Sequence, residues 1–358
     1  MRKKKILILY TSIGSGHKMA AQAIGEYLDK SLARVKTVNI SDYSDINIGD
    51  ISNGINLKNP VLGLIYDFLW NQETIVNLTK TTFSLLKDNF RRLHKLVDDF
   101  NPDVIVCTHA MGGIVAGQIK KRTKVFAVVT DSRVSPAWLN FEFDHYFVPN
   151  MLSKIDLLKK KIPSGKISIT GIPLRKQFEQ INKTNWVPKD GKLNDLLIMA
   201  GGTVGNKYLG SDDVFVNQIS NLLSKNKVTV VCGIHSNLYK KMIKIKSENL
   251  KVYKSVKQIA GLICESDLVI CKPGGLITSE AASLGKPLIL IGEGYGQEKG
   301  NIDYFVDNGA AIHVEKVKDL SKTIEIIIRN KLIPLLALNS KRVGMRNSAK
   351  SIATFLIS

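Results

Sequence analysis

The stretch of residues 267–292 constrains the fold of this chain more than any other stretch. Residues 268–270 are apolar and suit a buried strand, and residues 273–275, Pro-Gly-Gly, end that strand in a tight turn. Residues 276–284 then have the apolar spacing of a helix, and residues 288–291 are apolar again. The stretch therefore predicts a β-α-β unit with a glycine-rich turn at the start of its helix.

This turn has the properties of a phosphate site. Glycines let the backbone approach a ligand closely, and the start of a helix offers N–H groups and a partial positive charge, which suit a diphosphate. Glu280 lies about one and a half turns into the helix, where its carboxylate can accept hydrogen bonds from ribose hydroxyls. An ordinary β-α-β crossover has the same local pattern, so the pattern alone leaves both interpretations open.

A polar, glycine-rich segment at residues 294–301 directly follows the second strand. In an open α/β sheet this carboxyl edge is where ligands bind. Gln297, Glu298 and Asn301 carry side chains that suit sugar hydroxyls, although a solvated loop is also polar. The two loops on adjacent strand ends, one for phosphate and one for hydroxyls, are a more specific signal than either loop alone.

Strands and helices alternate through both halves of the chain, which predicts parallel sheets covered by helices on both faces. The first series of strands is expected at residues 6–10, 35–40, 103–107, 124–129 and 145–148. The second series is expected at residues 196–200, 228–232, 252–253, 268–271, 288–291 and 311–314. A polar stretch with Pro173 and Pro188 separates the series. We therefore expect the α/β class with two Rossmann-like, doubly wound domains.

A second glycine-rich loop, residues 11–17, follows the first strand and ends in His17. It lacks the third glycine and the acidic residue of a dinucleotide fingerprint, so a tight turn with a helix-capping histidine explains it too. As a functional group, the His17 imidazole would take a proton from an acceptor hydroxyl near neutral pH. His109 and Asp131 also follow strands, and each has three open roles: orienting His17, binding the acceptor or capping the next helix.

These motifs resemble those of GT-B lipid glycosyltransferases, and most of all the diacylglycerol glycosyltransferase and monogalactosyldiacylglycerol synthase family. The resemblance runs through most of the chain and rests on the loop at residues 10–17, on Thr130-Asp131 and on the segments 272–287 and 296–301. One departure stands out. Many family members have a histidine shortly after the Thr-Asp pair, where this chain reads Ser-Arg-Val-Ser up to Ser135.

The resemblance implies the GT-B fold, with two facing Rossmann-like domains and a cleft between them. Residues 1–172 would form the acceptor- and membrane-facing domain, residues 173–337 the UDP-sugar-binding domain, and residues 338–358 a helix that packs back on the first domain. The implied activity is inverting transfer of a hexose from UDP-hexose to a membrane lipid, with diacylglycerol as the expected acceptor.

The resemblance also implies site residues. The catalytic set is His17 as the base, with Asp131 and His109. The donor-binding set is Gly16, Gly202, Val256, Lys272, Pro273, Gly274, Gly275, Ser279, Glu280, Gln297, Glu298 and Asn301. No cofactor is expected because the UDP-sugar is a substrate, and no metal is expected because the second half has neither a DxD nor an HExxH motif. The dipole of the helix after Gly274 and the Lys272 ammonium would neutralise the leaving UDP.

Two other functions fit parts of the pattern. A GT-B-type UDP-sugar epimerase would need neither the net charge nor the apolar segment at residues 61–70. A non-enzymatic regulator that senses nucleotide sugars would keep the donor site and lose acceptor chemistry, and the departure at Ser135 is the one feature that points to it.

The formal net charge of +20 is spread over both halves of the chain. Such a charge favours anionic partners, although solvated lysines of a lysine-rich composition give the same number. No nucleic-acid recognition motif is present, so we expect an anionic membrane surface and no nucleic acid. Residues 61–70 fit a core helix, or a lipid-facing lip that carries Tyr66, Leu69 and Trp70.

The location of the protein is expected from what the sequence contains. Its four cysteines form no CxxC pair and look like small buried hydrophobic residues of a reducing compartment. The apolar run at residues 6–10 is too short for a signal peptide, and no run is long enough to span a bilayer. We therefore expect a cytoplasmic protein, peripheral on the inner face of the cell membrane.

Overall fold

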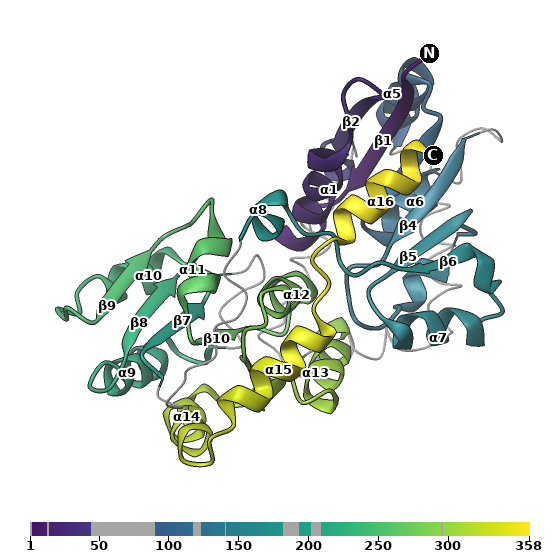
Figure 1. Cartoon of the computed structure of the whole chain (residues 1–358). Coiled ribbons are helices and arrows are strands. Elements are labelled where there is room, and N and C mark those ends of the chain that lie inside the picture. Colours follow the sequence, from purple (N-terminus) through teal and green to yellow (C-terminus); the bar gives the residue numbers. More distant parts are fainter. Residues whose placement is uncertain are drawn as a thin grey trace. The chain divides into compact units, whose positions relative to one another are not determined.

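The computed structural model describes residues 2–12, 14–43, 90–116, 123–139, 141–181, 193–201, 209–294 and 296–358. The chain forms two compact units (Figure 1). The first consists of Met1–Lys176, Tyr295–Gln297 and Asn347–Ser358, and the second of Gln177–Gly294 and Glu298–Arg346. Gly202 and the expected apolar lip with Tyr66, Leu69 and Trp70 lie outside the described residues.

The first unit is built on a six-stranded parallel sheet with the order β2-β1-β3-β4-β5-β6. Its strands are β1 (Lys4–Tyr10), β2 (Ala33–Asn39), β3 (Val104–Cys107), β4 (Lys124–Val128), β5 (His145–Val148) and β6 (Ile167–Ile169). Its helices of seven or more residues are α1 (Ser15–Tyr27), α5 (Arg91–Phe100), α6 (Ala110–Ala116), α7 (Met151–Lys159) and α16 (Ser348–Ile357). The short β6 was not expected, because three residues carry too little pattern to indicate a strand.

The second unit has its own six-stranded parallel sheet, with the order β12-β11-β10-β7-β8-β9. Its strands are β7 (Asp195–Met199), β8 (Lys227–Val231), β9 (Leu250–Tyr253), β10 (Leu268–Cys271), β11 (Leu288–Ile291) and β12 (Ala311–Val314). Its helices are α9 (Asp212–Leu222), α10 (Ser236–Met242), α11 (Ile259–Glu265), α12 (Gly275–Ser283), α13 (Gln297–Asp307), α14 (Leu320–Arg329) and α15 (Ile333–Val343). A single-turn helix, α8 (Lys176–Glu179), contains the point where the units divide.

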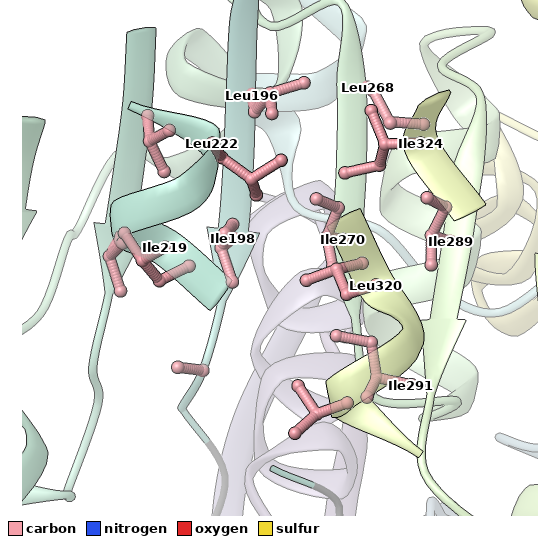
Figure 2. Packing of buried hydrophobic residues seen from close by; sticks show 14 of the residues in the cluster. Leu196, Ile198, Ile219, Leu222, Leu268, Ile270, Ile289, Ile291, Leu320 and Ile324 are labelled. Carbon is pink, nitrogen blue, oxygen red and sulfur yellow. The ribbon is translucent and has the colours of Figure 1, made fainter. Parts of the chain in front are cut away.

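The central strands are buried on both faces, which explains their unbroken apolar runs. Figure 2 shows the core on one side of the second sheet, where side chains of α9 and α14 pack onto the strands. The labelled residues of this core are Leu196, Ile198, Ile219, Leu222, Leu268, Ile270, Ile289, Ile291, Leu320 and Ile324. The expected α/β class and the two doubly wound sheets are therefore confirmed.

The C-terminal segment forms two helices rather than the one expected over residues 338–358. α15 belongs to the second unit, and α16 belongs to the first, where it lies beside α1 (Figure 1). Ile352, Ala353 and Leu356 of α16 are buried in the core that β1 and α1 share. The Ser348 hydroxyl donates to the Ile172 carbonyl at 2.6 Å, which fixes the start of α16.

Each sheet has one point where the order of its strands reverses. In the first sheet this point lies between β1 and β3, and in the second sheet it lies between β7 and β10. In open α/β sheets, ligands bind outside the carboxyl ends of the two strands at such a point. The topology thus predicts that ligands bind at the loops that follow these four strands.

We expect Gly344, which follows α15, to be essential for the position of α12. A Cβ atom on Gly344 would lie 2.1 Å from the carbonyl oxygen of Ala282 in α12. Gly344→Ala should therefore lower the free energy of unfolding by about 1–3 kcal/mol, the usual cost of overpacking, in urea unfolding. Gly165→Ala is the control, because its Cβ would meet nothing within 4 Å. Equal stability of the two variants would contradict this packing.

Candidate active site

His17 lies at the strand reversal of the first sheet. It is the third residue of α1, directly after the loop from β1, and residues after β3 and β4 surround it. Its Nδ1 is 2.9 Å from the Thr108 carbonyl oxygen and 3.0 Å from Thr130 Oγ1. The Thr108 hydroxyl donates to the His17 carbonyl at 3.0 Å, so both the ring and the backbone of His17 are held. Three neighbouring strands thus fix one imidazole.

The contact with Thr108 assigns the tautomer of His17. A backbone carbonyl can only accept a hydrogen bond, so Nδ1 of His17 carries the proton that it donates. The basic lone pair of the neutral ring is then on Nε2. A histidine oriented in this way through Nδ1 can take a proton at Nε2, which is the arrangement that general-base catalysis requires.

His109 packs against His17 edge to face, with ring centroids 4.6 Å apart and an interplanar angle of 85°. It is buried, and its Nδ1 accepts a hydrogen bond from the Met111 backbone N–H at 3.2 Å. Burial first, and the neighbouring His17 second, hold the pKa of His109 well below its ordinary value. His109 is therefore neutral with its proton on Nε2; its ring contacts that of His17, and its Nδ1 caps the start of α6.

Asp131 is half-buried and follows Thr130 in the loop after β4. This loop is tied to the start of α7. Asn150 Nδ2 and Ser153 Oγ both donate to the Ser132 carbonyl, at 3.1 and 2.8 Å. The structure thus brings His17 and His109 into ring contact and places Asp131 next to the threonine that contacts His17.

The Pro-Gly-Gly turn lies at the strand reversal of the second sheet, directly after β10. Gly274 is the N-cap of α12, which has no side-chain cap and no acidic residue in its first turn. The first N–H groups of a helix have no partners within the helix, and the helix dipole makes this end positive. The start of α12 therefore has the chemistry of a diphosphate site.

Two carboxylates and a lysine gather beside this turn. Lys272 Nζ donates to Glu298 Oε1 at 2.7 Å, an ion pair in which both side chains are partly buried. Glu280 is buried on α12. Burial raises the pKa of the Cys271 thiol at the end of β10, the Lys272 charge lowers it, and the charges of Glu280 and Glu298 raise it. Lys272 and Glu298, expected to act separately on UDP and sugar, are thus paired.

Asn301 shapes the Pro-Gly-Gly turn. Its side chain is fully buried, and its Nδ2 donates to the Pro273 carbonyl at 3.0 Å. Gln297, the first residue of α13, and Ser279 of α12 are half-buried, as is Gly16 of α1. Val256, another residue of the expected donor-binding set, lies in the loop between β9 and α11, which starts at Ile259.

Gly201 marks the end of β7, the other strand at this reversal. A Cβ on Gly201 would lie 2.9 Å from the Cα of Gly233, which follows β8. The two glycines therefore let the ends of β7 and β8 come together. Gly202, the neighbouring donor-site residue expected from the sequence, is outside the described residues.

The described residues contain no group of three or more His, Cys, Asp and Glu side chains placed to hold a metal ion. None of the helices among them is both long and apolar enough to cross a membrane.

The chain is similar to known proteins along nearly its full length. Residues 17–174 match the family of monogalactosyldiacylglycerol (MGDG) synthase, and residues 196–354 match the C-terminal domain of glycosyltransferase family 28. A Bacillus subtilis protein named processive diacylglycerol beta-glucosyltransferase is 30% identical over 367 residues, which cover 98% of this chain and 94% of that protein. The chain belongs to this glycosyltransferase family.

Solved structures give the fold of this glycosyltransferase. Acinetobacter baumannii MurG matches with a TM-score of 0.62 at 13% identity, and the match covers 99% of each chain. UDP-GlcNAc 2-epimerase from Neisseria meningitidis, bound to UDP-GlcNAc, matches with a TM-score of 0.62 at 18% identity and the same coverage. At these identities the likeness shows the fold alone, which is GT-B.

The sequence did not identify the groups that hold the glycosyltransferase's histidine. The Thr108 contact is made by a backbone carbonyl. Every residue type has this group, so the sequence does not indicate the contact. Thr130 belongs to the Thr-Asp pair of the motif, but only Asp131 of that pair was predicted as a site residue. The ion pair of Lys272 and Glu298 joins residues 26 positions apart, and only the packing of α13 against the end of β10 reveals it.

We expect acid to destabilise the glycosyltransferase through His109. The unfolded chain takes up this proton near pH 6.5, whereas the folded chain holds His109 neutral because its pKa is lowered. The contribution of His109 to the free energy of unfolding is therefore fully present above about pH 6.5. It is lost as the pH drops towards the pKa of the folded state, by at most roughly 1.4 kcal/mol per pH unit.

Urea unfolding at about pH 7.5 and about pH 5.5 tests this linkage. His109→Gln, which keeps an acceptor for the Met111 N–H, should lose less stability between the two pH values than the wild type loses. If both proteins lose the same free energy, His109 is not the group that makes acid destabilising.

Proposed function

We propose that this enzyme transfers glucose from UDP-glucose to the hydroxyl of diacylglycerol at a membrane surface, with inversion at the anomeric carbon. The observation that carries the proposal is His17, which three strands hold with its basic lone pair on Nε2. The names of the relatives, processive diacylglycerol beta-glucosyltransferases, support the sugar, the acceptor and the β product.

The second unit binds the donor in this proposal. The diphosphate of UDP-glucose accepts hydrogen bonds from the first N–H groups of α12, at Gly275 and the residues after it. Glu280 accepts hydrogen bonds from the ribose, and Glu298 binds the glucose hydroxyls. Lys272, paired with Glu298 at 2.7 Å, holds that carboxylate in place and adds positive charge beside the diphosphate.

The reaction is a single displacement. The diacylglycerol oxygen forms a bond to the anomeric carbon while the bond from that carbon to the UDP oxygen breaks. The hydroxyl proton passes to Nε2 of His17, while Nδ1 keeps its own proton and donates it in a hydrogen bond to the Thr108 carbonyl. UDP leaves with the additional negative charge, which the N-terminus of α12 stabilises. Attack opposite the leaving group turns an α-linked donor into a β-linked product.

The partner surface of this enzyme is an anionic membrane in our proposal. A formal net charge of +20 attracts acidic lipids, and each lysine near such a surface contributes about 1 kcal/mol. Tyr66, Leu69 and Trp70 were expected to insert in the membrane, and they lie outside the described residues.

A product assay tests the proposed function. The pure protein is incubated with labelled UDP-glucose and vesicles that contain diacylglycerol, and the lipid extract is analysed. The expected product is β-glucosyl diacylglycerol. An exchange of UDP-sugars with no labelled lipid would instead favour the epimerase, and donor binding without any product would favour the regulator.

We expect His17→Gln to separate catalysis from binding. Loss of a general base typically lowers the rate by about 100- to 10,000-fold, so kcat should fall by that factor while the affinity for UDP stays at the wild-type value. Steady-state kinetics and calorimetry measure the two quantities. A variant with nearly wild-type kcat would remove His17 from the mechanism.

We expect Glu280→Ala to weaken donor binding. The loss of hydrogen bonds between ribose hydroxyls and a carboxylate should cost about 1–3 kcal/mol of binding free energy, measured by titration calorimetry with UDP. Calorimetry in EDTA should give the same wild-type affinity, because no metal takes part in this proposal. Unchanged UDP affinity in the variant would exclude the ribose contact.

A further inference from the structure

We propose that α7 is the element that docks the first unit on the surface of a membrane rich in acidic phospholipid. The proposal rests on the proposed function, since a transferase whose acceptor is diacylglycerol must reach a membrane. It assigns this contact to a helix that neither the sequence motifs nor the family matches single out.

The outer face of α7 is apolar and exposed. Met151 is 58% exposed, Leu152 38%, Ile155 37% and Leu158 40%. Met151, Ile155 and Leu158 have the spacing i, i+4 and i+7, so they form one stripe along the helix. Ser153 and Leu157 on the opposite face are buried. Single exposed apolar residues are ordinary, but four on a nine-residue helix form a patch that marks an interaction site.

Lysines border this apolar stripe, which identifies the partner as an anionic surface. Lys154 lies within the helix, and Lys159, Lys160 and Lys161 follow one another at its end. The single carboxylate of α7, Asp156, is paired with Arg133 at 2.8 Å. Lysines at the end of a helix also stabilise its dipole, but that effect gives no reason for an exposed apolar face. An apolar face with basic borders is the pattern of helices that lie in a membrane interface.

The position of α7 connects docking with the reaction. The helix begins at Met151, just after the carboxyl end of β5, so its exposed first turn lies at the same edge of the sheet as His17. β5 pairs with β4, which leads into Thr130, and Thr130 contacts His17. A membrane on α7 would therefore lie close to the histidine that deprotonates the acceptor.

Hydrogen bonds make α7 and the loop after β4 one rigid piece. Asn150 caps the helix by accepting from the Ser153 N–H at 2.9 Å, and it donates to the Ser132 carbonyl at 3.1 Å. Arg133 binds Asp156 through two nitrogens, each at 2.8 Å. These bonds tie the docking element directly to the loop that carries Thr130, so both belong to the same edge of the first unit.

The first experiment removes the apolar stripe. Met151→Gln, Ile155→Gln and Leu158→Gln are combined in the full chain, and binding to vesicles of phosphatidylglycerol and phosphatidylcholine is measured by co-sedimentation. Because three half-exposed apolar side chains are lost, the lipid concentration for half-maximal binding should rise about 30-fold.

The matched control removes an equal number of exposed apolar residues from the second unit. Ile326→Gln, Leu335→Gln and Leu338→Gln change residues that are 37%, 55% and 56% exposed on α14 and α15. This control should bind vesicles like the wild type. Equal loss of binding in both triple variants, or in neither, would overturn the proposal.

A second experiment tests the charge. Lys154→Glu with Lys159→Glu is compared with Lys36→Glu and Lys95→Glu, which make the same charge change in a basic groove between β2 and α5 of the same unit. Only the α7 variant should lose binding to vesicles with phosphatidylglycerol. If both variants lose it equally, net charge attracts the membrane and α7 is not its docking element.

A third readout separates this inference from the proposed function. With a short-chain, dissolved diacylglycerol, the α7 triple variant should keep the wild-type kcat, and with vesicle diacylglycerol it should lose activity as binding is lost. If the wild type glucosylates neither form, the proposed function is wrong. Co-sedimentation still tests whether α7 binds the membrane, because it does not depend on activity. If the triple variant changes the oligomeric state in light scattering and leaves vesicle binding intact, the patch binds a second copy and the proposal is wrong.

Discussion

A parallel sheet directs every loop that follows a strand to the same edge, and each unit of this protein depends on that constraint. In the first sheet it gathers the loops after β1, β3 and β4 around one histidine. In the second sheet it brings the turn after β10 beside the end of β7. The burial of both sheet faces by helices stabilises the sheets, and it leaves the carboxyl edges as the places where polar side chains and free backbone groups meet a ligand.

The two edges use backbone groups in opposite senses. At the first edge the Thr108 carbonyl oxygen accepts a hydrogen bond from Nδ1–H of His17 and thereby sets which ring nitrogen is basic. At the second edge the N–H groups at the start of α12 face a ligand that carries negative charge. Both effects come from main-chain geometry, so side-chain identity alone specifies them weakly. His109 packs against His17 and stays neutral because its pKa is lowered by burial. His109 therefore does not compete with Nε2 of His17 for the proton of the acceptor hydroxyl.

Much of the fold could be predicted because short sequence patterns indicate most of its strands and helices. The apolar run of Leu268–Cys271, followed by Pro-Gly-Gly, gave both the strand and the helix start, and His17 was recognised through the glycines before it. Elements with little pattern, such as the three-residue β6, were missed. The break between α15 and α16 was missed as well, because it depends on the close approach of Gly344 to α12.

Contacts between residues that are distant in the sequence could not be predicted from it either. The tie between Lys272 and Glu298 and the burial of Asn301 against Pro273 arise only when α13 packs over the end of β10. The exposed face of α7 was missed for a related reason. Met151, Ile155 and Leu158 have ordinary helical spacing, and only the structure shows that this stripe faces away from the core while Leu157 faces it.

The central claim is that His17 is a base whose lone pair lies on Nε2, and nitrogen-15 NMR of histidine-labelled protein tests it most directly. The two ring nitrogens of a neutral histidine have different shifts according to which one carries the proton, and the His17→Gln variant assigns the signals. At about pH 7.5, above the ordinary histidine pKa, His17 should carry its proton on Nδ1, and His109 should carry its proton on Nε2. A His17 ring protonated on Nε2 would contradict the account, because the nitrogen needed to accept the substrate's proton would already hold one.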